Sequence, residues 1–427
     1  MSELTQKDKA HVWHPFTQHH PAGTPLEIVK AKGIYLTDSE GKEYIDANSS
    51  WWVNTHGHAH PHIGEAINNQ FKTIDHIVFA GVTHPKAVEL AERTVGYMPE
   101  NLTKVFFSDN GSTAVEIAMK MVIQYWHNKG EGKQRFLAMQ GSYHGDTFGA
   151  MSVGERGYFN APFEPLFFDS DYIDFPNGNN EDSILEQAES LFASGEFAGM
   201  IIEPLVQGAA GMRMYSPQFL DQLSTLAHQH NVLIIFDEVM TGYGRTGKLF
   251  AMDHCSVKPD LITLSKGLTA GVMALGLTVA SDEIYNAFLG DETTKALLHG
   301  HSFTANPIAC AVACANLDLF ERKETWETIE SIGNWNAEFA FELGELDCVE
   351  NIRQQGTILA FEIKTGEGNT YFSDIKMQAY NHFLKDGILL RPLGNVIFVN
   401  PPYCIAKDEY QKIETSILDF LTPNSRH

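Results

Sequence analysis

Through the middle of the chain, short apolar runs alternate with longer amphipathic stretches. The runs are continuous rather than alternating, which is typical of strands that are covered on both faces of a sheet. The predicted strands are 104–107, 135–139, 200–202, 232–236, 261–264 and 275–280. In the stretches between them, apolar residues recur every three or four positions, as on one face of a helix. The predicted helices are 87–97, 112–127, 217–230 and 306–321.

This alternation of strand and helix predicts an α/β fold, in which a mostly parallel central sheet is wrapped by helices. The two ends of the chain differ from the middle. The first residues contain a hairpin-like segment with its turn at 39–41, and strands at 357–363 and 396–399 lie between two C-terminal helices. We therefore predict one small α+β domain built from both ends. The predicted division is 1–55 and 325–427 for the small domain, and 56–324 for the large one.

The composition excludes several classes of partner. Lys and Arg number 30 against 54 Asp and Glu, so the formal net charge is −24. Such a balance argues against binding to nucleic acid or to an anionic membrane surface. It also means that any site for an anionic cofactor must build its own local positive field. With 427 residues, the chain can bury a large core without disulfides or a structural metal.

The cysteines and the N-terminus predict a cytoplasmic protein. The five cysteines form no C-x-x-C pair, and an odd number of this kind is typical of a reducing compartment. The first sixteen residues lack the apolar segment of a signal peptide. The longest apolar run, 308–315, is too short to span a bilayer. Within it, Cys310 and Cys314 lie one helical turn apart, and we assign both to the core.

Two charged residues follow neighbouring predicted strands. Asp237 ends the run VLIIFD, and Lys266 follows LITLS one strand–helix unit later. Ligands of open α/β sheets bind at the carboxyl ends of strands. Separately, Asp237 could cap a turn and Lys266 could be a solvated loop residue. Together they supply what pyridoxal phosphate needs, namely an amine that forms a Schiff base and an anion that keeps the pyridine nitrogen protonated.

Three further segments carry groups suited to such a cofactor. In FFSDNGSTAVEIAMK, Gly111 and Ser112 start a helix whose free N–H groups suit a phosphate, unless this is an ordinary capped helix. Tyr143, in a glycine-flanked loop, could stack on the cofactor or lie on the surface. In HGHSFTANP, Ser302 and Thr304 could donate to a phosphate or cap the helix that starts there.

A histidine-rich segment suggests a rival, non-enzymatic interpretation. His56, His58, His60 and His62 alternate, so an extended strand would present all four on one side as metal ligands. Gly57 and Pro61 break a regular strand, however. We therefore predict no metal site here.

Taken in this order, the motifs resemble those of the class III, fold type I aminotransferases, from about Trp13 to Pro402. The most specific part is D-E-x-x-T-G-x-G-R-T-G at 237–247, followed by S-K-G at 265–267. Within that family the chain is most similar to the enzymes of biotin synthesis that convert 8-amino-7-oxononanoate to 7,8-diaminononanoate. The segments that carry this closer resemblance are WHPFTQ (13–18), SSWWVNTHGHAHP (49–61), YHGDTFGAMSVG (143–154), IIEPLVQGAAGMRMY (201–215) and RPLG (391–394).

The resemblance implies a role for each matching residue. Lys266 would hold pyridoxal phosphate and move the proton, and Asp237 would pair with the pyridine nitrogen. The other implied cofactor contacts are Gly111 and Ser112 at the phosphate, Tyr143 on the ring, and His301 and Ser302 from the partner subunit of a homodimer. The implied substrate contacts are Phe16, Trp51, Tyr143, Lys266, Gly300 and Arg391. Arg391 would grip the far carboxylate, which suits its bidentate fork, although a surface ion pair is the alternative.

Two positions depart from relatives within this family and bear on the substrates. Ala209 stands where many ω-aminotransferases have a glutamate, which weighs against a donor of the glutamate type. Phe16 stands where users of adenosylmethionine have tyrosine, so the amino donor is adenosylmethionine or lysine. Another class III ω-amino acid or diamine aminotransferase is the alternative enzyme. Arg245 could orient Glu203 or another carboxylate, and the sequence leaves its role open.

Overall fold

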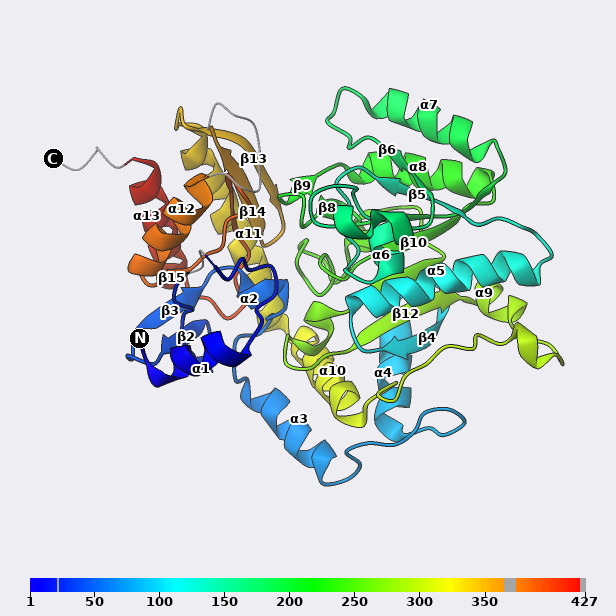
Figure 1. The fold of residues 1–427 in the computed structure, drawn as a ribbon, viewed down its shortest axis with the longest axis horizontal. Helices are drawn as coiled ribbons and strands as arrows, with labels where there is room; N and C mark the ends of the chain where they lie inside the picture. Colours follow the sequence, from blue (N-terminus) through cyan, green and yellow to red (C-terminus); the bar gives the residue numbers. More distant parts are fainter. Residues whose placement is uncertain (21–22, 365–373, 423–427) are drawn as a thin grey trace.

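The computed structural model describes residues 1–20, 23–364 and 374–422. Its largest element is a sheet of seven strands (Figure 1). In sheet order the strands are β4 (Leu102–Ser108), β12 (Gly276–Ser281), β11 (Leu261–Leu264), β10 (Leu233–Asp237), β7 (Phe197–Ile202), β5 (Arg135–Met139) and β6 (Ser170–Ile173). β12 runs antiparallel to both of its neighbours, and the other pairs are parallel. The predicted α/β class, with a mostly parallel sheet, is confirmed.

Helices cover both faces of this sheet. Successive residues of a strand point to opposite sides, so a continuous apolar run places apolar side chains on both faces. In β10, Leu233 and Ile235 belong to the core cluster under α5 (Gly111–Asn128). Ile234 and Phe236 belong to the cluster on the other face, where α8 (Pro217–Gln229) packs. Full burial of such a side chain stabilises a fold by roughly 1.5–3 kcal/mol. The continuous apolar runs therefore reflect burial on both faces.

The remaining helices of the middle region surround the sheet and extend below it (Figure 1). They are α3 (Pro61–Phe71), α4 (Pro85–Gly96), α6 (Phe148–Ser152), α7 (Glu181–Phe192), α9 (Asp282–Ala287) and α10 (Pro307–Phe320). Short 3-10 turns add Ala161–Leu166, Ala251–His254, Lys266–Thr269 and Thr293–Lys295, and β8 (Val206–Gln207) pairs with β9 (Arg213–Met214). Cys310 and Cys314 are buried in α10, which confirms their assignment to the core. Among the helices that the structure describes, none is long and apolar enough to cross a bilayer.

The two ends of the chain meet in a second sheet beside the first. Its strands are β1 (Ile28–Lys32), β2 (Tyr35–Asp38), β3 (Glu43–Asp46) and β15 (Ile388–Leu389). β2 and β3 form the predicted hairpin, whose turn contains Gly41 at φ 87°. β15 joins β3 in parallel and so brings a C-terminal strand onto the N-terminal hairpin.

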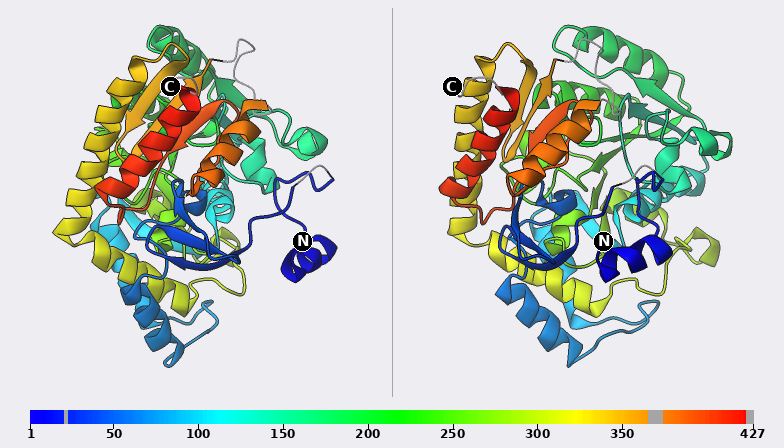
Figure 2. Two further views of the ribbon diagram at one scale, coloured as in Figure 1. Left: turned by 90° about the vertical axis from the view of Figure 1, so that its left-hand side faces the viewer. Right: turned by 60° about the vertical axis from the view of Figure 1, so that its left-hand side comes forward.

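A third, antiparallel sheet completes this part of the molecule. It contains β13 (Val349–Gln355), β14 (Ile358–Ile363) and β16 (Val396–Val399). α11 (Lys323–Gly344), α12 (Asp374–Lys385) and α13 (Lys407–Leu421) gather beside these strands, with the N-terminal α1 (Glu3–His11) and α2 (Ser49–Trp52) below (Figures 1 and 2). The division at 1–55, 56–324 and 325–427 stays a prediction, and its residues 365–373 and 423–427 lie outside the described part of the chain.

The turn between β13 and β14 packs backbone to backbone against residues 245–247. Gly356 has φ 56°, and a Cβ there would lie 2.2 Å from the amide nitrogen of Gly247. Next to it, the Thr357 amide donates to the Arg245 carbonyl at 3.0 Å. Only a residue without a side chain permits this approach.

We predict that Gly356→Ala lowers the free energy of unfolding by about 2–4 kcal/mol, because backbone overlap adds to the left-handed φ. Gly41→Ala is the matched control, since Gly41 also has a positive φ, but no atom of the described residues lies within 4 Å of a Cβ placed there. Urea unfolding monitored by circular dichroism measures both. Equal losses for the two variants would show that the packing at Gly356 contributes nothing.

Candidate active site

A cavity of about 410 Å³ opens at the carboxyl ends of β10 and β11. Its walls come from the ends of several strands, the start of α5 and the turn after β3. Residues that line it include Trp52, Gly111, Ser112, Tyr143, His144, Glu203, Ala209, Asp237 and Lys266. The sheet thus brings Lys266, Asp237, Tyr143, Gly111 and Ser112, predicted from separate segments, to one place.

Asp237 is a buried carboxylate at the last position of β10, with only 4% of its surface exposed. Its Oδ2 lies 2.7 Å from Nδ1 of His144. Its Oδ1 accepts hydrogen bonds from the Val239 amide and the Thr263 hydroxyl, both at 3.1 Å. These contacts fix the orientation of the carboxylate and leave a buried negative charge facing the cavity.

Lys266 begins the turn after β11, on the strand next to Asp237. Its backbone has φ 44°, a left-handed conformation that costs a non-glycine residue about 1–3 kcal/mol. Its Nζ lies 4.8 Å from the centre of the Trp52 ring. Burial lowers the pKa of this amine, whereas attraction to Asp237 and Glu203 opposes the decrease. Burial therefore favours the neutral, nucleophilic form.

The start of α5 forms the end of the cavity that suits an anion. Asn110 and Thr113 make a reciprocal capping box, so the amides of Gly111 and Ser112 begin the helix at the cavity wall. The first N–H groups of a helix have no acceptor within it, and its dipole is positive at this end. Gly111 must be glycine, because a Cβ would lie 2.7 Å from the Val239 side chain.

Tyr143 and Glu203 also line the cavity. The Tyr143 hydroxyl donates to Asp146 at 3.0 Å, and burial raises its pKa well above the usual range. Glu203 follows β7 and accepts the amides of Tyr143 and Gly208 at 3.0 and 2.9 Å. Burial raises the pKa of Glu203 to about 7.

Sequence reasoning did not select Glu203 or His144 as site residues. Glu203 follows an apolar strand just as Asp237 ends one, so the same strand-end rule applied to IIEP would have found it. His144 carried no comparable signal. Its partner Asp237 is 93 residues away, and only the folded sheet brings the two side chains together.

A second cluster contains the predicted substrate contacts Phe16, Trp51 and Arg391. The Phe16 and Trp51 ring centres are 5.5 Å apart, and the Arg391 guanidinium lies 5.6 Å from the Trp51 ring. Phe159 adds a fourth member at 6.2 Å from Phe16. None of the four lines the cavity itself, but Trp52 does. The cluster is therefore joined to the cavity through adjacent tryptophans.

The predicted contacts Gly300, His301 and Ser302 do not line the cavity of their own chain. They lie in the loop between the 3-10 turn at Thr293–Lys295 and α10. There the His301 amide donates to the Thr304 hydroxyl at 3.1 Å, and the Nζ of Lys120 lies 3.0 Å from Nδ1 of His299.

Arg245 is fully buried, and its contacts answer the question that the sequence left open. Its guanidinium donates to the Asn54 carbonyl at 2.9 Å, the Asn400 amide oxygen at 3.1 Å and the Ser49 hydroxyl at 3.2 Å. All these acceptors are neutral, and among the described residues no carboxylate lies within ion-pair distance of it. Arg245 therefore ties the chain ends together and does not orient Glu203.

The four alternating histidines do not share a site. His58 contacts Asp46 at 2.9 Å and His62 contacts Asp318 at 2.7 Å, while His56 is buried against the Phe320 ring. The extended strand that the metal interpretation required is absent, because α3 begins at Pro61. Across the described residues, no group of three or more potential ligands could hold a metal ion.

The geometry of the cavity fits a phosphorylated aldehyde cofactor. An amine with lowered pKa faces a buried carboxylate, a glycine-started helix offers amides to an anion, and Tyr143 supplies an aromatic wall. His144 strengthens the fit, because its buried Nε2 has no hydrogen-bond partner among the residues that the structure describes and its Nδ1 orients Asp237. Fold and site together define the class of enzymes that bind pyridoxal phosphate as a Schiff base.

Comparisons with known proteins agree. The family model "Aminotransferase class-III" matches residues 17–421. The adenosylmethionine-8-amino-7-oxononanoate aminotransferase of Synechococcus elongatus is 46% identical, over 96% of this chain and 98% of that protein. The crystal structure of the protein of the same name from Methanocaldococcus jannaschii is 36% identical, with a TM-score of 0.94 and 99% of each chain covered. A PLP-bound amine transaminase from an uncultivated Pseudomonas species is 29% identical, with a TM-score of 0.90 and coverage of 96% and 98%.

The chain therefore belongs to the class III aminotransferase family. It is a pyridoxal-phosphate-dependent aminotransferase, as the sequence predicted.

The buried His56 predicts a measurable dependence of stability on pH. Burial lowers its pKa to about 3, so the folded state keeps it neutral while the unfolded chain takes up a proton below about 6.5. The unfolded state then binds more protons, and stability is lost as the pH falls. We predict that the free energy of unfolding of the wild type, relative to His56→Gln, decreases by up to about 1.4 kcal/mol per pH unit below 6.5.

Urea unfolding of both proteins at a series of pH values between 7 and 5 checks this. His76→Gln is the control, because His76 is exposed. A pH-independent difference between wild type and His56→Gln would contradict the prediction.

Proposed function

We propose that the protein transfers an amino group to the ketone of 8-amino-7-oxononanoate, forming 7,8-diaminononanoate for biotin synthesis. Two observations support this substrate. Full-length relatives with 46% and 41% identity carry that substrate in their names. An arginine stacked on an aromatic cluster also lies beyond the cavity, where the far carboxylate of a long acid would reach. We further propose a cytoplasmic location and the domain division given above.

Each residue of the cavity has a proposed part in holding the cofactor. Lys266 provides the amine that tethers it, and Asp237 provides the anion opposite the ring nitrogen. Gly111 and Ser112 offer the amides at the start of α5 to the phosphate. Tyr143 covers one face of the ring. When bound, pyridoxal phosphate supplies an aldehyde that takes the amino group and a cationic ring that accepts the electron pair of the breaking C–H bond.

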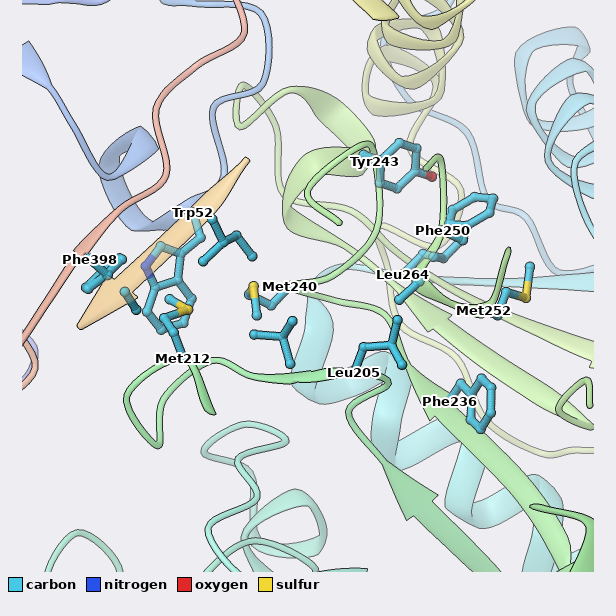
Figure 3. Packing of buried hydrophobic residues seen from close by; sticks show 14 of the residues in the cluster. Trp52, Leu205, Met212, Phe236, Met240, Tyr243, Phe250, Met252, Leu264 and Phe398 are labelled. Carbon is cyan, nitrogen blue, oxygen red and sulfur yellow. The ribbon is translucent and has the colours of Figure 1, made fainter. Parts of the chain in front are cut away.

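The reaction then depends on what these side chains do with protons. The lowered pKa of Lys266 favours the neutral form of its Nζ, and the neutral amine can take the proton from the amino-bearing carbon of the donor. In the second half of the reaction, the same Nζ returns a proton to the carbon that becomes aminated. His144 donates to Asp237 and holds the carboxylate in place throughout. Trp52 and Met240 give the cavity an apolar wall (Figure 3), which limits contact of the reacting atoms with water.

The distal cluster is proposed to select the acceptor. The guanidinium of Arg391 can bind a carboxylate through two parallel hydrogen bonds, and Trp51 covers the methylene chain. Ala209 lines the cavity where a glutamate would otherwise add a negative charge. We therefore favour the long acceptor over the alternative, another class III ω-amino acid or diamine aminotransferase.

We also propose that the enzyme works as a homodimer with shared active sites. Gly300, His301 and Ser302 lie outside their own cavity, in a loop with exposed apolar side chains. Leu298 is 75% exposed and Phe303 is 63% exposed, which is costly unless a partner covers them. In a dimer this loop would bring His301 and Ser302 to the phosphate of the partner's cofactor.

The acceptor assignment can be tested in a single turnover. We predict that enzyme preloaded with the amino group converts 8-amino-7-oxononanoate to 7,8-diaminononanoate, detected by mass spectrometry, and that borohydride then fixes the cofactor's mass on Lys266. Lys266→Ala should lose both the product and the mass, with at least a 1000-fold lower rate, on the order expected for loss of the nucleophile. Lys258→Ala, on a lysine bound to backbone carbonyls outside the cavity, should keep both. Absence of product from the preloaded wild type would reject the acceptor assignment, and product from Lys266→Ala at the wild-type rate would reject the role of Lys266.

Phe16 allows a test of the amino donor. With adenosylmethionine as donor, we predict that Phe16→Tyr raises kcat/KM for it by about fivefold, since one net hydrogen bond contributes about 1 kcal/mol. The value for lysine should stay unchanged. Phe159→Tyr, which adds the same hydroxyl to the neighbouring ring, is the control. If the wild type and Phe16→Tyr both use lysine and neither uses adenosylmethionine, lysine is the donor.

A further inference from the structure

The turn that carries the two tryptophans has an unusual backbone. Within α2, Ser49, Ser50 and Trp52 all have positive φ values of 50°, 60° and 61°. Ser50 combines φ 60° with ψ −90°, and Trp51 is also non-helical. None of these residues is glycine, so each conformation is unfavourable for its side chain. Such a backbone persists only where its surroundings hold it.

One buried carboxylate holds this turn. Asp46, the last residue of β3, is fully buried. Its Oδ1 accepts the Ser50 amide at 2.6 Å, and its Oδ2 accepts the Ser50 hydroxyl at 2.8 Å. His58 contacts the same Oδ2 at 2.9 Å and thereby fixes the carboxylate from the other side. The Asp46 carboxylate thus binds both the amide and the hydroxyl of Ser50, and we call this pair of hydrogen bonds the clamp.

The turn held by Asp46 places two consecutive tryptophan side chains at different ends of the proposed substrate site, one near Lys266 and one near Arg391. Trp52 lies between Phe398 and Met240 (Figure 3). The Nζ of Lys266 lies over the same ring, 4.8 Å from its centre. Trp51 instead lies under Arg391. A regular helix could not divide neighbouring side chains in this way, because it would turn them by only about 100° relative to each other.

The same stretch of chain also holds Arg391. Two residues after Asp46, the side chain of Asn48 accepts the Arg391 amide at 2.6 Å and donates to the Phe398 carbonyl at 2.8 Å. In addition, β3 pairs with β15 through Asp46 and Leu389. Residues 46–52 therefore connect the reacting amine to the distal guanidinium.

We propose that Asp46 is a positioning residue that, through Ser50, sets the length of substrate the enzyme accepts. By holding the strained turn, it fixes the span between the Nζ of Lys266 and the guanidinium of Arg391. An unbranched substrate gripped at both ends then reacts well only if its length matches that span. This inference rests on the proposed function for the identity of the substrate, but the clamp itself acts on any acid held at Arg391.

Ser50→Gly is the decisive variant. Ser50 is exposed, so its replacement leaves no hole in the core, and glycine adopts a positive φ without strain. We expect an unfolding midpoint no lower than that of Ser50→Ala, which loses only the hydroxyl. The KM for 8-amino-7-oxononanoate should rise about tenfold with kcat within twofold, because a less fixed span between Lys266 and Arg391 weakens binding of the substrate and of its transition state alike. Asn231→Gly, which relieves a φ of 54° in a remote surface turn, should leave both constants unchanged.

The main readout is the preference for chain length. For the wild type, kcat/KM should fall for homologues of the acceptor that are shorter or longer. For Ser50→Gly and Asp46→Asn this discrimination should shrink about tenfold. A purely structural role would lower the unfolding midpoint and all rates together without changing the ratio. A ratio that Ser50→Gly leaves within twofold of the wild type overturns the proposal.

A binding measurement separates this proposal from the proposed function. Quenching of tryptophan fluorescence by unbranched keto acids of increasing length reports the span without turnover, when they are added to enzyme that carries no amino group to transfer. If the wild type does not aminate 8-amino-7-oxononanoate, the proposed function fails. The positioning proposal still stands if binding has a length optimum that Ser50→Gly flattens, and it falls if the optimum is absent or unchanged.

Discussion

The whole site depends on keeping an amine and a carboxylate buried beside each other. Removing either charge from water is costly, and the cost is repaid only when hydrogen bonds and an opposite charge surround it. Asp237 meets this requirement through His144, Thr263 and the Val239 amide. Lys266 follows the next strand, and there burial lowers the pKa of its amine while attraction to Asp237 opposes the decrease. Because parallel strands end at one edge of the sheet, the fold fixes this arrangement before any ligand arrives.

The protein's strongly negative charge makes that local arrangement more important. With a net charge of −24, the average field repels a phosphate. We propose that the attraction comes from the backbone amides at the start of α5, which act over a short distance. The glycines at 111 and 145 allow the chain to pack closely here, since side chains at these positions would overlap with Val239 and Ser112. Binding of an anion is therefore a property of the backbone in this protein.

Much of the fold could be predicted from the sequence, since strands buried on both faces leave continuous apolar runs. All six predicted central strands lie in the large sheet. The seventh, β6, reads SDYI and gave no such run, because an edge strand is only partly buried. The antiparallel direction of β12 left no mark in its sequence either. In the site, single residues beside a strand end were found, whereas pairs made across the fold, such as His144 with Asp237 and Asp46 with Ser50, were not.

The pairing of β3 with β15 has a consequence for how the chain matures during synthesis. The ribosome releases residues 28–52 early, yet their partners at 388–400 emerge only after more than three hundred further residues. Until then, the edge of β3 lacks its pairing with β15, and the Trp52 ring lacks its contact with Phe398. The half of the site that holds Lys266 can assemble first. The part that contains Arg391 is completed last. A nascent chain stalled before its final strands can therefore have a cofactor pocket but no selectivity for the length of the substrate.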